Sequence, residues 1–259
     1  MLIGSMNFPG RSVAKEIHRI HEAGFDFVDL TLEPPAAWTP DGREVARLLG
    51  DLGLTAVGHT AWYLPIASSF PELRQQARDL FRRALDTFAD ANVTLVNVHP
   101  DQRVPLHSVQ QVRKMNGEAI ANLVGDAAER GVTVMVENLD RLFSSVEDLQ
   151  PIFEAVPKAR FHLDVGHANL NLGLRGKNRT PDLVAAFGDR LAHVHVSDNR
   201  GGAEDLHLPL GAGTVDWRSA IRTLKEAGYA GTVTLEVFSR EPEHLKTSRR
   251  LWLEWWSAA

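Results

Sequence analysis

The sequence predicts a (β/α)8 barrel, and three observations predict it. Apolar runs with the character of strands alternate with amphipathic helical segments along the whole 259-residue chain. Alternation of this kind is typical of an α/β fold with a parallel sheet, and we find eight such runs, the number that closes a barrel. Carboxylates and imidazoles end nearly every run, which favours a site on the rim of a barrel over the single crevice of an open, doubly wound sheet.

Each predicted strand is a short apolar or alternating segment bounded by turn residues or by a helical segment. LTAVGH, VTLVNVH and VTVMVEN show the pattern most clearly, because each closes on a polar side chain. The eight predicted strands span residues 2–6, 25–33, 54–59, 93–99, 132–138, 160–166, 191–199 and 232–238. No glycine-rich phosphate-binding motif follows any of them, which argues against a nucleotide-binding open sheet.

The segments between the strands carry helix signals. We expect Ser12 to cap the first helix and Gly24 to end it, and we expect Gly53 and Gly131 to end two later helices. The predicted helices span residues 12–23, 41–52, 71–91, 108–130, 146–156, 181–187 and 217–227, with a last helix from residue 241 onward. Because no linker or low-complexity stretch interrupts this order, we expect one domain over residues 1–259.

The composition is that of an ordinary globular protein, with 44% hydrophobic and 24% charged residues. The chain has no cysteine, which excludes disulfides and thiolate metal sites. No apolar stretch is long enough for a membrane span, and MLIGSMNFPG lacks the basic start of a secretion signal, so we expect a cytoplasmic protein without a membrane partner. The net charge of -5 supplies no overall basic field for nucleic acid, although a local basic groove stays open.

Six predicted strands end in residues that bind metals. These residues are His59, His99, Glu137, Asp164, His195 and Glu236. The carboxyl ends of barrel strands converge on one rim, where active sites lie, so the matching depth of the six predicts a metal centre. Nitrogen and oxygen ligands without sulfur suit a divalent cation. His162 and His193 lie two positions deeper on the inward face, and we expect them to be hydrogen-bonded core histidines.

Several segments resemble the xylose isomerase-like TIM-barrel superfamily, and the resemblance covers nearly the whole chain. These segments are VNVHP, VMVEN, LDVGHANL, HVHVSDN, DLHLPLGAGTVDW and TLEVF. The superfamily includes sugar and sugar-phosphate isomerases and epimerases, and also endonuclease IV. As a set the motifs are specific for the superfamily and not for one activity, so the resemblance implies a metal-dependent enzyme and leaves its substrate open.

The resemblance also implies roles for particular residues. An epimerase-type site would take its metal ligands from the last four strands, and these are here Glu137, Asp164, His195 and Glu236. An endonuclease IV-like site adds five ligands and holds three zinc ions, and the matching positions are His59, His99, His167, Asp205 and His207. Because all nine residues are present, we expect one to three divalent ions, with zinc and manganese as the first candidates.

The resulting hypothesis is a metal-dependent isomerase or epimerase of carbohydrate metabolism that binds a small sugar or sugar phosphate. Glu137 and Glu236 would transfer a proton at a carbon next to a metal-polarised carbonyl. The alternative is an endonuclease IV-like phosphoester hydrolase that cuts DNA at abasic sites, and only this alternative needs nucleic acid. Against it stand the acidic balance of the chain and the proline-rich segment EPPAAWTPDG, which lacks the basic residues expected of a duplex-gripping loop.

Three further residues are candidates for substrate binding. Glu33 ends the second predicted strand, where it would contact a sugar hydroxyl or cap the next turn. Trp62 would form a wall against a sugar ring, and Arg200 would bind a phosphate or carboxylate with its planar fork.

The tail RRLWLEWW places Trp252, Trp255 and Trp256 on one helical face. An aromatic surface of this size is costly to expose. We therefore expect this face either to pack on the chain's own barrel or to make a homodimer contact.

Overall fold

The computed structural model describes residues 1–259, with residue 175 described by its backbone alone. Its strands follow one another in the order of a closed barrel, so the predicted (β/α)8 fold is confirmed. The strands are β1 Leu2–Met6, β2 Phe27–Leu32, β3 Thr55–Thr60, β4 Leu95–Val98, β5 Thr133–Glu137, β6 Arg160–Asp164, β7 Leu191–Val196 and β8 Thr232–Leu235. All eight predicted strands are present, although several end earlier than predicted.

Helices fill most intervals between the strands. They are α1 Val13–Glu22, α2 Gly42–Asp51, α3 Pro71–Asp90, α4 Val109–Ala128, α5 Val146–Ala155, α6 Val165–Ala168, α7 Leu172–Arg175, α8 Thr180–Phe187, the 3-10 turn η1 Gly188–Arg190, α9 Trp217–Glu226 and α10 Pro242–Ala258. The sequence does not predict α6 and α7, because four residues are too few to show a helical period. Among the described residues, no helix combines the length and the apolar character needed to cross a membrane.

The chain forms two compact units. The first unit holds residues 5–137 and 147–160, and the second holds residues 1–4, 138–146 and 161–259. The prediction of one domain over residues 1–259 stays a prediction.

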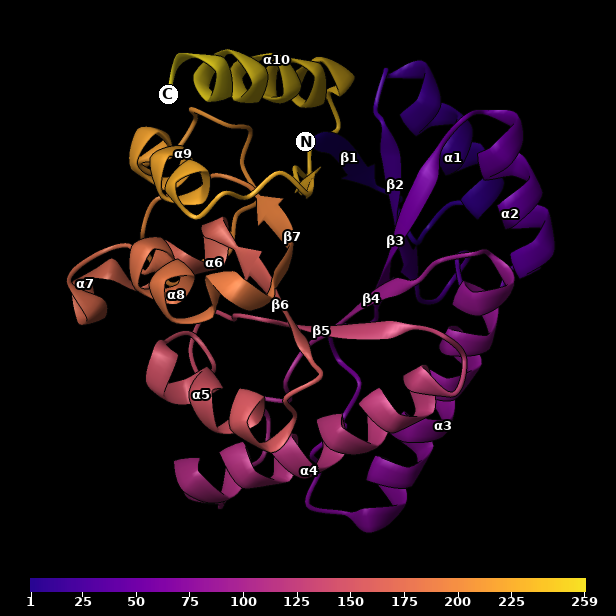
Figure 1. Cartoon of the computed structure of the whole chain (residues 1–259), viewed down its shortest axis with the longest axis vertical. Helices are drawn as coiled ribbons and strands as arrows, with labels where there is room; N and C mark the ends of the chain where they lie inside the picture. Colours follow the sequence, from indigo (N-terminus) through magenta and orange to yellow (C-terminus); the bar gives the residue numbers. More distant parts are fainter. The chain divides into compact units, whose positions relative to one another are not determined.

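In the first unit, parallel pairing sets the depth of the strand ends. Strands β2 to β5 pair with their neighbours, and α1 to α4 lie outside them (Figure 1). Thr31 pairs with His59, His59 pairs with Asn97, and Val98 pairs with Val136. The register therefore brings the polar ends of β3, β4 and β5 to similar depths.

A cluster of ion pairs around Asp126 joins α3 to α4. Nε and Nη2 of Arg78 donate to the two carboxylate oxygens at 2.6 and 2.9 Å, and Arg82 lies 3.5 Å away. The Asp126 side chain is buried, and the hydrogen bonds from Arg78 hold its pKa below the usual value. This carboxylate is therefore a point where stability depends on pH.

We expect Asp126→Asn to lower the free energy of unfolding by about 2 kcal/mol at neutral pH, because it removes a bidentate, charge-assisted hydrogen bond. Since the folded-state pKa is lowered, this stabilisation is complete above the unfolded-state pKa and is lost as pH falls through the folded-state pKa. Urea unfolding at pH 7 and pH 3 measures both effects, and the difference between variant and wild type should shrink at pH 3. Asp51→Asn, which breaks an exposed pair with Arg47, is the control, and equal losses in the two variants would contradict the prediction.

In the second unit, β6, β7 and β8 pair in parallel. Asp164 at the end of β6 pairs with His195 in β7, and Val196 pairs with Leu235 in β8. Glu236 follows Leu235 directly. The register therefore brings the ends of these three strands, with their predicted metal ligands, to one level.

The C-terminal helix α10 packs beside α9 in the second unit (Figure 1). Trp252 is fully buried with its ring 6.1 Å from that of Trp217, and Trp255 stacks on Trp217 at 6.2 Å. The tryptophan face thus packs on a helix of its own chain, which is the first of the two predicted arrangements. The homodimer contact stays a prediction.

Candidate metal centre

Three buried side chains at the ends of β6, β7 and β8 face one another. Nδ1 of His195 lies 3.1 Å from Oε2 of Glu236 and 4.0 Å from Oδ2 of Asp164. One ligand atom from each residue lies within 4.8 Å of the others. Buried carboxylates side by side need positive charge between them, so this group has the chemistry of a divalent-cation site.

A second cluster surrounds Asp205, in the loop between β7 and α9. Oδ2 of Asp205 lies 2.9 Å from Nε2 of His167 and 2.9 Å from Nε2 of His207. Nδ1 of His207 lies 3.6 Å from Oε2 of Glu236, which links this cluster to the first one. The distances bring together all six metal ligands that were predicted in the second unit.

The charges in this cluster support one another. Burial raises the pKa of Asp205, but hydrogen bonds to His167 and His207 outweigh it and leave that pKa well below its usual value. Burial likewise lowers the pKa of His207, but the carboxylates of Glu236 and Asp205 outweigh it and raise this pKa to about 9. The cluster therefore favours positive charge beside the two carboxylates.

The backbone fixes which nitrogen of His167 faces the cluster. Nδ1 of His167 lies 2.9 Å from the carbonyl oxygen of Asn138. A carbonyl oxygen only accepts, so Nδ1 carries the proton and donates it, and Nε2 faces Asp205. Backbone carbonyls orient metal-binding histidines in this way in many proteins.

The first unit holds a third cluster, around Glu137 at the end of β5. Oε2 of Glu137 lies 3.0 Å from Nε2 of His99 and 4.0 Å from Nε2 of His59. The two imidazole rings are 4.9 Å apart. Glu137 and His59 are buried, and His99 is partly buried. The structure thus brings together the three metal ligands that were predicted in this unit.

Two asparagines that the sequence analysis did not single out position these ligands. The amide of Asn97 donates to Oε2 of Glu137 at 2.5 Å. Asn138 donates to the backbone carbonyl of Asp164 at 2.9 Å and accepts from its N–H at 2.8 Å. Because side chains alternate along a strand, the spacing in VNVH places Asn97 on the same face as His99 and so gave a signal. The contact between Asn138 and Asp164 joins residues that are distant in the sequence and has no local signal.

Residues 17–255 match the family described as the xylose isomerase-like TIM barrel. The chain belongs to this family. It is 28% identical over 270 residues to L-ribulose 3-epimerase of Methylomonas sp. (strain DH-1), and the match covers 98% of this chain and 89% of that relative.

Two solved structures show the same fold as this xylose isomerase-like barrel. The crystal structure of a D-tagatose 3-epimerase-like protein has a TM-score of 0.87 at 22% identity, covering 100% of this chain and 98% of that chain. The crystal structure of the IOLI protein, with a bound zinc atom, has a TM-score of 0.82 at 16% identity, covering 100% of this chain and 99% of that chain.

The donor chemistry of this family member fits a divalent metal. Glu137, Asp164 and Glu236 are buried carboxylates, and each lies within 4.0 Å of at least one imidazole. The chain has no cysteine, so the ligands are nitrogen and oxygen atoms, which suit zinc or manganese. A buried carboxylate without a cation would be costly, and a metal ion at these strand ends would remove that cost.

The deeper histidines lie below this level. Nδ1 and Nε2 of His193 lie 2.7 and 3.1 Å from the hydroxyls of Thr232 and Thr234, as expected of a hydrogen-bonded core histidine. Ring nitrogens of His162 and His193 also approach one of His195 within 4.8 Å. Since both nitrogens of His193 have hydroxyl partners, we assign it to the core.

The predicted substrate-binding residues lie in different surroundings. Glu33 directly follows β2 and is half-buried; burial raises its pKa, although the Tyr63 hydroxyl donates a hydrogen bond to its carboxylate. Trp62 is 60% exposed, and the guanidinium of Arg103 lies 5.1 Å from its ring centre. Arg200 is exposed in the loop after β7. Their contact with a substrate stays a prediction.

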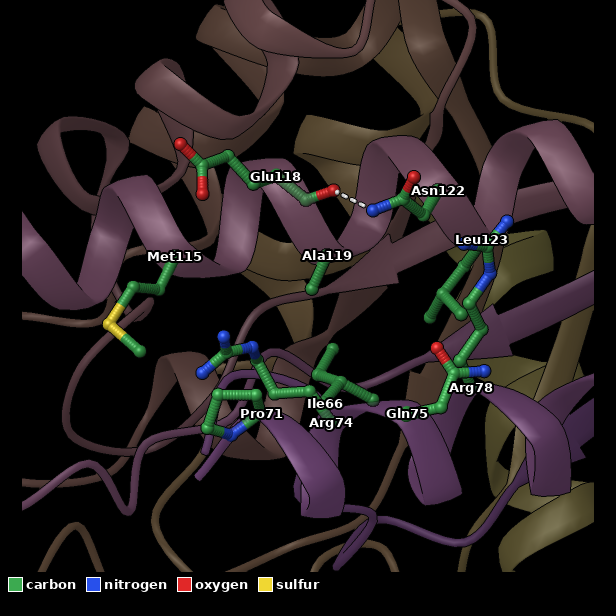
Figure 2. A pocket seen from close by; sticks show the side chains of 10 residues that line it. All are labelled: Ile66, Pro71, Arg74, Gln75, Arg78, Met115, Glu118, Ala119, Asn122 and Leu123. Atoms are coloured by element: carbon green, nitrogen blue, oxygen red, sulfur yellow. Dashed lines mark hydrogen bonds between the residues drawn. The ribbon is translucent and has the colours of Figure 1, made fainter. Parts of the chain in front are cut away.

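A cavity of about 390 Å³ lies elsewhere in the first unit, between α3 and α4 (Figure 2). Pro71, Arg74 and Arg78 line it from α3, and Met115 and Glu118 line it from α4. Arg78 is already paired with Asp126. None of the predicted metal ligands lines this cavity, so we do not assign the active site to it.

Proposed function

We propose that this chain is a divalent-metal-dependent epimerase or isomerase of a sugar or sugar phosphate. The observation that carries the proposal is the buried group of Asp164, His195 and Glu236 at the ends of three successive strands. The family membership supports it, as does the likeness along 98% of the chain to an L-ribulose 3-epimerase. The substrate that this likeness suggests is a ketose, and the reaction is inversion at its carbon 3.

We further propose which residues hold the metal. Glu137, Asp164, His195 and Glu236 would hold the first ion, zinc or manganese. His59, His99, His167, Asp205 and His207 would hold up to two more. A bound ion acts as a Lewis acid that polarises the substrate carbonyl and so acidifies the neighbouring C–H group.

The protein's own groups would move the proton. Glu137 and Glu236 stand at the ends of β5 and β8, which are separated by two other strands in the order of the barrel. We propose that the two carboxylates act on opposite faces of one carbon. One would remove the proton from the carbon and the other would return a proton to the opposite face, which inverts the centre.

Other residues would prepare these bases and bind the sugar. The amide of Asn97 donates to the Glu137 carboxylate, which fixes its orientation. Glu33, Trp62 and Arg200 would contact the part of the sugar that does not react. Trp62 offers an exposed aromatic face, to which the apolar side of a sugar ring or chain can pack.

Exchange of the carbon-bound proton with solvent tests the proposal. In deuterated water, L-ribulose and related ketoses should gain one deuterium at carbon 3 as the epimer forms, measured by NMR and mass spectrometry. We expect Glu137→Gln to slow this exchange by about a thousandfold, because an amide cannot act as the base. Glu118→Gln on the surface of α4 is the matched control and should keep the wild-type rate.

Two results would contradict the proposal. One is the absence of exchange with every free and phosphorylated ketose in the metal-loaded protein. The other is exchange at an equal rate in the Glu137→Gln variant. Chelator-sensitive cleavage of a DNA duplex at an abasic site, without any carbon-bound exchange, would instead favour the phosphoester hydrolase.

A further inference from the structure

The loop that carries Asp205 and His207 closes around one buried carboxylate. Asp198 follows β7 and is 1% exposed. Its oxygens accept from the backbone N–H groups of Asn199, Gly211 and Val215 at 3.0, 2.9 and 3.1 Å, and from Nε1 of Trp217 at 3.0 Å. Four donors from both ends of the loop therefore converge on one side chain.

The backbone around Asp198 reaches the position next to His207. Asp198 and Leu208 exchange two backbone hydrogen bonds, at 2.9 and 2.8 Å. Gly213 completes the closure, because a Cβ atom at this position would lie 2.2 Å from Oδ1 of Asp198 and 2.2 Å from the carbonyl oxygen of Asn199. A side chain at position 213 would therefore push the loop away from the Asp198 carboxylate.

His207 is held in a backbone conformation that a residue with a Cβ atom rarely adopts. Its φ angle is 44°, in the left-handed region. Such a conformation persists only where the surroundings over-determine it, and it is concentrated at functional sites. Here the carbonyl oxygen of His207 accepts from the N–H of Phe238 at 3.1 Å, and its ring lies 4.3 Å from the Phe238 ring. The residue after His207, Leu208, is held by its two backbone hydrogen bonds with Asp198.

We propose that Asp198 is a positioning residue that holds His207 and Asp205 in place to bind a divalent cation. Asp198 acts through the backbone of the loop and does not itself touch the ligand, because its oxygens are directed at the four N–H donors. The inference rests on the proposed function only in that it gives Asp205 and His207 a role at the metal centre. It adds a residue, three positions beyond His195, on which that role depends.

A double-mutant cycle on cobalt binding tests the inference. Calorimetric titration of the metal-free protein with Co²⁺ compares the wild type, Asp198→Asn, His207→Ala and the double variant. Asparagine has the same shape but faces the N–H donors with an amide group. We expect Asp198→Asn to weaken the Co²⁺ binding that depends on His207 by about tenfold or more. In the His207→Ala background this binding is already lost, so Asp198→Asn should have no further effect there.

Controls separate positioning from general support of the fold. Asp216→Asn, at the exposed N-cap of α9, makes the same chemical change and should leave Co²⁺ binding unaltered. If Asp198→Asn does not fold, Trp217→Phe removes only one of the four hydrogen bonds to Asp198, and it should weaken Co²⁺ binding severalfold in the wild-type background alone. Hydrogen exchange should rise in the peptide covering residues 199–216 and not in β7.

The outcomes distinguish this inference from the proposed function. Equal weakening in the wild-type and His207→Ala backgrounds would overturn it, because Asp198 would then act on the whole fold. Unchanged Co²⁺ binding in His207→Ala would overturn it too, because there would be nothing to position. If no ketose exchanges its proton but the cobalt cycle shows the expected coupling, the proposed reaction fails and the positioning role stands.

Discussion

Replacing Asp164 by alanine should abolish tight metal binding and reduce turnover by more than about a hundredfold. Oδ1 of Asp164 accepts from the N–H of His167 at 2.6 Å, and Oδ2 faces Nδ1 of His195. The Asp164 carboxylate thus belongs to the group with His195 and Glu236 and also caps the N-terminus of α6. The loss of metal binding is measured as the metal content of the protein after gel filtration, by elemental mass spectrometry.

His207→Ala is the matched variant for this prediction. It should lose at most one of the one to three ions and keep the ion held by Asp164, His195 and Glu236. A wild-type protein that purifies gently without metal, or an Asp164→Ala protein with its full metal content, would refute the assignment. We expect Asp164→Ala to keep its fold, because the hydrogen bonds between Asn138 and residue 164 involve the backbone of that residue. Circular dichroism of the variant checks this.

Trp252→Ala should lower the free energy of unfolding by about 3–5 kcal/mol, because it leaves a large cavity between α10 and α9. The Trp252 ring is fully buried against the ring of Trp217 and packs near that of Trp256 at 5.7 Å. Its Nε1 has no hydrogen-bond partner among the described residues, so the ring contributes through packing alone. Denaturant unfolding of the metal-free protein measures the loss.

Two variants on the same helix calibrate this result. Trp252→Phe keeps most of the apolar volume and loses no hydrogen bond, so it should cost less than half as much as alanine. Leu253→Ala changes a neighbouring residue that is 39% exposed and should cost little. A Trp252→Ala protein as stable as Leu253→Ala would show that α10 does not need this contact.

The sequence predicted the parts of this fold that depend on repetition. Eight apolar runs separated by long amphipathic segments were enough to predict the barrel. Over ten or more residues, the hydrophobic period of a helix can be told apart from that of a strand. The strand-end ligands followed from the same pattern, since a polar residue that closes an apolar run stands at a known depth. Helices α6 and α7 did not follow, because each is only four residues long.

Contacts between distant segments could not be predicted in this way. Asn138 pairs with Asp164, and the Asp198 carboxylate gathers donors from as far along the chain as Trp217. Asp198 follows His195 closely in the segment HVHVSDN, which makes it a candidate to orient metal ligands, but the sequence does not show which donors its carboxylate accepts from. The left-handed conformation of His207 likewise depends on its neighbours, because histidine adopts positive φ more often than most residues with a Cβ atom but still does so rarely.

The first strand of the chain pairs with a residue that is made much later. The backbone N–H of Leu2 donates to the carbonyl oxygen of Gly231 at 3.1 Å, just before β8. At roughly 5–20 residues per second of synthesis, Leu2 waits on the order of ten seconds or more for this partner to be made. During that interval the N–H group of Leu2 lacks this partner, and unpaired groups along a strand edge are the kind of surface that joins other chains. The order of the strands alone therefore sets how long a growing chain carries β1 without this partner.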